Sequence, residues 1–122
     1  MIALVVRPFC KNLEEVYSTV HGGIYQCNRL NCFWLEFAGG LSAFKINDFL
    51  QLVKQVEQID VVEMAQNSAR VADVAIINPF RSERCFVLTL TDVLNLREIL
   101  QGAKVMLELN SIIYECLHGM AV

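Results

Sequence analysis

The hydrophobic pattern changes its period at two matching places along the chain. Residues 44–52 align with residues 88–96, which lie 44 positions later, so that hydrophobic, polar and capping residues all correspond. In each segment apolar residues first alternate, as in a strand with one buried face, and then recur every three or four residues, as in a helix. Asn47 and Thr91 are the expected N-caps, and each precedes an aspartate in the first helical turn. Each copy therefore predicts a strand that runs directly into a helix.

Each copy also begins with an earlier candidate strand. Residues 33–46 contain two apolar strands around an Ala-Gly-Gly turn, and residues 74–90 contain two more around a longer polar loop. Residues 16–27 add a hairpin whose turn is His-Gly-Gly. The repeated unit is thus strand, strand, helix. We expect an α+β fold with a mainly antiparallel sheet and the helices on one face.

The chain is expected to form one domain over residues 1–122. Its length is near the commonest size of a single domain, and no Pro-, Ser- or Gly-rich linker divides it. Residues 60–69 carry the weakest pattern, which predicts a helix end followed by a loop.

The composition is more apolar than one small core needs. Hydrophobic residues make up 55% of the chain and the mean hydropathy is +0.43, whereas an ordinary domain has an apolar share of roughly 45–50%. Charges such as Glu36, Lys45, Glu108 and Glu115 interrupt every apolar stretch that approaches the length of a membrane span. Without a span or a recognisable signal peptide, the expected location is the cytoplasm, and the surplus favours burial against a second chain.

The last helix is where we expect that second chain to bind. From residue 92 to about 118, apolar residues form two lines at helical spacing, so one line can face the sheet and the other a partner. Gly102 is expected to bend or break the helix. The alternative is a helix that its own domain buries on two sides. The predicted homodimer interface consists of Val93, Leu96, Leu100, Leu107, Asn110 and Tyr114.

A group of cysteine and histidine residues is the only candidate metal site. His21, Cys27 and Cys32 lie close in sequence around predicted turns, and zinc sites use N and S ligands of this kind. The C-x4-C spacing is looser than the C-x2-C knuckle that is typical of structural zinc. Five cysteines without an export signal favour reduced thiols, and a metal site is kept as the alternative.

The same region carries a resemblance to a known family. His21-Gly22, Cys27, the apolar strand 33–37 and the strand-to-helix segment 44–49 together resemble a family of short, uncharacterised bacterial proteins of the Bacteroidetes type. The family pattern runs His-Gly, a C-x2-C knuckle, an apolar strand and a capped helix. This chain departs from it, because Leu30 stands where the second knuckle cysteine is expected. The resemblance implies a bacterial, cytoplasmic protein and no particular activity.

Several other functions have little support in the sequence. The net charge is −3 and the basic residues are scattered, which argues against nucleic-acid binding. No phosphate-binding glycine loop is present, and no Cys-His pair has the spacing of a nucleophile and its base. Trp34 beside Tyr25 is a candidate binding patch if both are exposed. The preferred hypothesis is a non-enzymatic homodimeric interaction or ligand-binding module, and the alternative is a small zinc protein that uses His21, Cys27 and Cys32.

Overall fold

The structure, a computed structural model, describes residues 13–27, 31–66, 74–79 and 85–120, with backbone alone for 118–120. The α+β prediction is confirmed, and every strand pair in the described residues is antiparallel. The strands form two sheets rather than one, with the orders β1-β2-β3-β4 and β5-β6. In chain order the elements are β1 (Leu13–Thr19), β2 (Gly22–Cys27), β3 (Cys32–Phe37), β4 (Gly40–Lys45), α2 (Ile46–Glu57), α3 (Val61–Gln66), β5 (Val74–Ile77), β6 (Phe86–Thr89) and α4 (Leu90–Met120).

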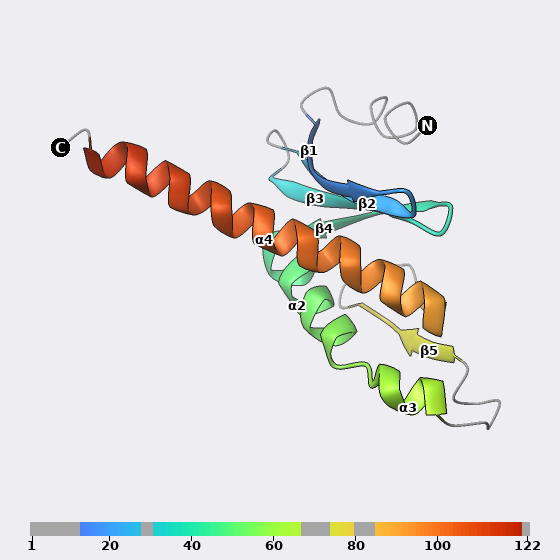
Figure 1. The fold of residues 1–122 in the computed structure, drawn as a ribbon. Helices are drawn as coiled ribbons and strands as arrows, with labels where there is room; N and C mark the ends of the chain where they lie inside the picture. Colours follow the sequence, from blue (N-terminus) through green and yellow to red (C-terminus); the bar gives the residue numbers. More distant parts are fainter. Residues whose placement is uncertain (1–12, 28–30, 67–73, 80–84, 121–122) are drawn as a thin grey trace.

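Helix α4 is the central element of the fold. In the view of Figure 1 it runs diagonally across the molecule, with the four-stranded sheet above it and α2, α3 and β5 below it. It contacts β1 and β2 of the larger sheet, both shorter helices and both strands of the smaller sheet. The packing of every layer therefore depends on this helix as far as Leu107.

The core lies between the four-stranded sheet and the helices. Phe33, Leu35 and Phe37 alternate along β3 and are all buried, so this face of the sheet meets the helices. The ring of Phe33 packs on Phe49 of α2 with 4.8 Å between the ring centroids. The helices contribute a matching set of buried residues, which are Phe49, Leu52, Val53 and Val56 from α2 and Val93, Leu96, Ile99, Leu100 and Ala103 from α4.

Two tight turns fix the register of the four-stranded sheet. Val20 and His21 connect β1 to β2, and the next residue must be Gly22, because a Cβ there would overlap the carbonyl oxygen of Glu36. Ala38 and Gly39 connect β3 to β4 with φ angles of 53° and 77°. Two successive positive φ angles are typical of the type I′ hairpin turn, whose twist matches that of the strands.

The two strand-to-helix junctions lie where the sequence predicts them, but their caps differ from the prediction. Helices α2 and α4 begin at Ile46 and Leu90, with no residue between strand and helix. The N-caps are therefore Lys45 and Thr89, which lie two residues before the predicted Asn47 and Thr91. The hairpin-then-helix order occurs twice, but the two hairpins belong to separate sheets. That the chain is built from a repeated strand-strand-helix unit stays a prediction.

Only the second junction has a side-chain cap. The backbone N–H of Thr89 donates to the carboxylate of Asp92 (3.1 Å), and the N–H of Asp92 donates to the Thr89 hydroxyl (3.2 Å). This reciprocal arrangement is a capping box, and it satisfies two backbone donors at the start of α4. Lys45 makes no side-chain cap at α2. The shorter helix therefore depends more on its buried face.

The segment after α2 is more regular than predicted. Residues 61–66 form α3, and the carboxylate of Asp60 caps it by accepting a hydrogen bond from the N–H of Glu63 (3.0 Å). The predicted loop at 67–69 lies outside the described residues. Helix α2 itself ends against Arg97 of α4, whose guanidinium donates to the carbonyl oxygens of Ile59 (2.8 Å), Val56 (3.0 Å) and Glu57 (3.4 Å).

Gly102 neither bends nor breaks α4, which continues as a helix on both sides of it. A Cβ at this position would overlap the aromatic ring of Tyr17 in β1. The glycine is therefore explained by close packing of the helix against the sheet, and the prediction of a helix break is wrong.

Candidate functional site

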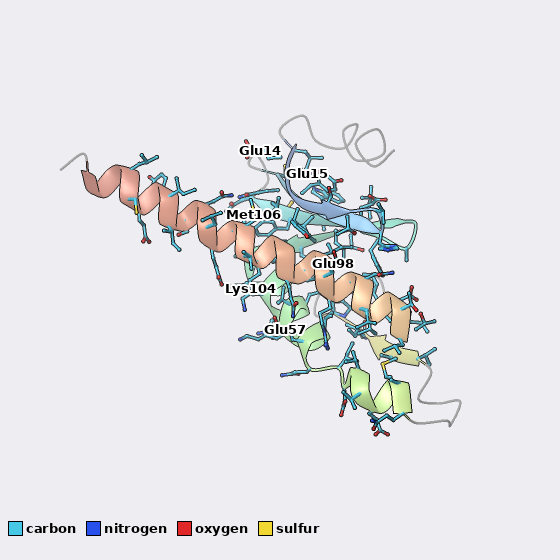
Figure 2. All side chains as sticks on the ribbon, viewed as in Figure 1. Glu14, Glu15, Glu57, Glu98, Lys104 and Met106 are labelled. Carbon is cyan, nitrogen blue, oxygen red and sulfur yellow. The ribbon has the colours of Figure 1, made fainter. Side chains whose placement is uncertain are left out.

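Helix α4 extends well beyond the rest of the fold. Leu107 still packs against the core, but every side chain from Glu108 to Leu117 is exposed. We call residues 108–117 the arm. At 1.5 Å per residue the arm is about 15 Å long. Figures 1 and 2 show this end of α4 standing clear of the sheet and of α2, with its side chains pointing into open space on all sides.

The arm is rich in large apolar side chains. Their exposed fractions are high, and Val105, one turn before the arm, is also 60% exposed. At about 100° per residue, the apolar side chains of the arm span roughly 200° of the helix circumference, with Asn110 among them. Glu108, Ser111 and Glu115 form one polar strip on the opposite side. A helix that is apolar around so much of its surface is normally buried. The apolar residues of the arm are Leu109 (45% exposed), Ile112 (56%), Ile113 (48%), Tyr114 (62%) and Leu117 (63%).

The residues predicted for a dimer interface separate into two groups. Val93, Leu96 and Leu100 are buried in the chain's own core, where they face the sheet and α2. They expose almost no surface to a partner, so the predicted interface is corrected at these three positions. Asn110 and Tyr114 are exposed on the arm, and Leu107 is half-buried at its base. The alternative of a helix buried on two sides by its own domain describes α4 as far as Leu107.

Two exposed apolar residues of the arm were not predicted from the sequence. Leu109 and Ile112 belong to neither of the two heptad lines that carried the interface prediction, because those lines follow the core-facing side of the helix. The signal in the sequence that could have found them is the excess of apolar residues. Composition shows this excess for the whole chain and does not show which positions are exposed.

The predicted metal ligands are not brought together. Cys27 and Cys32 are direct cross-strand partners on β2 and β3, and Cys27 is fully buried. His21 lies in the turn at the opposite end of β2, and a strand of this length spans about 17–20 Å. Within the described ranges no group of three His, Cys, Asp or Glu side chains is placed to hold a metal ion. The ligand set of His21, Cys27 and Cys32 is therefore corrected to a cysteine pair with a distant histidine.

Tyr25 and Trp34 are also cross-strand partners, on the sheet face away from the helices. Tyr25 is only 6% exposed, so it does not form the open aromatic patch that the sequence suggested. Burial, followed by the negative charges of Glu15 and Glu36, raises the pKa of Tyr25 to about 12. The phenol is therefore neutral at physiological pH. Its oxygen lies over Gly23, 3.2 Å from where a Cβ would be.

Comparison with known proteins adds no function to this geometry. No family model, no curated protein and no solved structure matches the chain. The resemblance to short bacterial proteins therefore stays an expectation from the sequence. None of the helices, over the residues that the structure describes, has the length and apolar character that crossing a membrane requires.

Proposed function

We propose that this protein is a non-enzymatic interaction module of the cytoplasm that forms a homodimer through the arm of α4. The observation that carries the proposal is the run of exposed apolar side chains from Leu109 to Leu117, in the part of α4 that extends beyond the core of the chain. The resemblance to short bacterial proteins supplies no activity, so the proposal depends on this surface.

The energy available from the arm is large enough to drive association. Full burial of a Leu, Ile or Val side chain contributes roughly 1.5–3 kcal/mol, so each half-exposed side chain of the arm offers about 1 kcal/mol. With five such residues and Val105 in each of two copies, covering both arms offers on the order of 10 kcal/mol. Association costs roughly 4–15 kcal/mol in lost translational and rotational freedom. The two quantities are comparable, which favours a dimer that dissociates on dilution.

A pair of matched variants tests the proposal. Leu109→Lys with Ile112→Lys adds two positive charges to the apolar surface, whereas Ser111→Lys with Glu115→Gln adds the same charge to the polar strip of the same helix. We expect analytical ultracentrifugation to show that the first variant is monomeric and that the second dimerises like the wild type. Circular dichroism checks that both remain folded. Equal self-association of the two variants would contradict the proposal.

A further inference from the structure

The small sheet carries a second exposed apolar surface. On the inner face of the β5–β6 hairpin, Ile77, Phe86 and Leu88 are buried against the core. On the outer face, Ile76 is 68% exposed and Val87, its direct cross-strand partner, is 62% exposed. Val74 lies beside them and is 40% exposed. We call Val74, Ile76 and Val87 the hairpin face.

This pattern is unusual for a sheet that faces water. An antiparallel sheet with one solvated side normally alternates apolar and polar residues, whereas strands covered on both sides are continuously apolar. Residues 74–77 (Val-Ala-Ile-Ile) and 86–88 (Phe-Val-Leu) are continuously apolar. A two-stranded ribbon is also only marginally stable alone. The hairpin face therefore has the composition of a surface that is covered in the working assembly.

The two exposed surfaces lie at opposite ends of the same helix. The hairpin leads directly into α4 at Leu90, and the centre of the arm is near Ile112. Consider a second copy whose α4 runs antiparallel to α4 of the first, so that the two helices meet near Gln101 of each. Ile112 of the second copy would then lie level with Leu90 of the first copy. Glu98 and Gln101 are exposed, so this side of α4 is open. The same alignment brings Leu94, which is 48% exposed, within one residue of the level of Leu109 in the second copy.

The area also indicates that the arms need another surface. A Leu, Ile or Val side chain loses roughly 60–120 Å² of apolar surface on full burial. Two arms with their Val105 residues then offer roughly 400–700 Å² of apolar area, and at about 60% apolar content this implies a total interface of roughly 700–1,200 Å². Stable interfaces bury about 1,200–2,000 Å². Adding the hairpin face and Leu94 of both copies raises the total to roughly 1,100–2,000 Å².

We infer that the arm of each copy docks on the hairpin face of the other, in a reciprocal two-fold dimer. The inference rests on the proposed function, because it names the surface that receives the arm. Each copy contributes one arm and one hairpin face, so the dimer contains two equivalent arm-to-face contacts. Both surfaces of both copies are then covered, and no site is left for a third copy.

Mixing two variants tests this arrangement. The arm variant is Leu109→Lys with Ile112→Lys, and the face variant is Ile76→Glu with Val87→Glu. Each alone should associate at least tenfold more weakly than the wild type, since both contacts of its homodimer are damaged. An equimolar mixture should recover a dimer in native mass spectrometry. In that heterodimer one contact is fully wild-type and the other pairs lysines with glutamates.

The outcomes separate the inference from the proposed function. A wild-type protein that is monomeric at every concentration overturns both. A wild-type dimer, with a face variant that dimerises as tightly as the wild type, leaves the function standing and overturns the inference. As a second readout on a nearly native chain, a photo-crosslinking residue at position 112 should capture residues of β5 or β6 from another copy. Capture of another arm, or of an unrelated protein, would contradict the inference.

Discussion

At the scale of single residues, Gly102 shows how one position decides the fit of α4 against the sheet. Helix propensity favours Ala over Gly by about 1 kcal/mol in a helix interior. A Cβ at this position, however, would overlap the ring of Tyr17. Overpacking of this kind typically costs roughly 1–3 kcal/mol. The steric cost therefore exceeds the gain in propensity.

Gly102→Ala should lower the free energy of unfolding by about 1 kcal/mol, measured by urea denaturation. In a Tyr17→Ala background the ring is absent, so the same Gly102→Ala change should instead raise stability. A destabilising effect of equal size in both backgrounds would show that Tyr17 is not the reason for the glycine.

Tyr25 gives the fold a specific sensitivity to alkaline pH. Its pKa is raised from 10.0 to about 12 in the folded chain, mainly by burial and further by Glu15 and Glu36. The folded state therefore holds the phenol proton more tightly than the unfolded state. The resulting stabilisation is fully present below pH 10 and is lost as the pH rises from about 10 to about 12.

A Tyr25→Phe variant removes this titration. Between pH 10 and pH 12 its thermal midpoint should fall less than that of the wild type, because the remaining alkaline effects are common to both proteins. Parallel curves for the two proteins across this range would contradict the assigned pKa.

At the scale of elements, the helix ends explain why prediction from the sequence worked in part. The period change at residues 44–46 and 88–90 is local, so the sequence located both strand-to-helix junctions. The cap of α4 was misplaced by two residues because Thr89 and Thr91 are both good N-cap types, and the start of the helix decides between them. At α2 the N-cap is Lys45, which cap preferences do not favour over Asn47. The end of α2 was not predictable, since it depends on Arg97, which lies about 40 residues away in sequence.

Arg97 should therefore be important for the packing of α2 on α4. Its guanidinium donates to three carbonyl oxygens at the C-terminal end of α2, where a positive charge also interacts favourably with the helix dipole. Replacing Arg97 with Met keeps the apolar stem and leaves these carbonyl groups without the donor. We expect a loss of roughly 1–3 kcal/mol in unfolding free energy by chemical denaturation. A loss below about 0.5 kcal/mol, the level of an ordinary surface substitution, would show that water replaces the arginine.

At the scale of the whole molecule, the composition predicted an uncovered apolar surface, and the structure shows where that surface lies. The apolar surplus indicated an uncovered surface, but helical periodicity cannot show which of two apolar lines faces the chain's own sheet. Val93, Leu96 and Leu100 proved to be core because α2 and the sheet cover their side of α4. The three predicted metal ligands are not neighbours for a related reason, since His21 lies at the end of the hairpin opposite to Cys27 and Cys32.

The central claim is that the arm of α4 binds a second copy, and the molar mass in solution tests it most directly. One chain has a mass of 13.8 kDa. Light scattering coupled to gel filtration should give twice this mass at high protein concentration and a decline towards the single-chain value on dilution. A mass of one chain at every concentration would contradict the account.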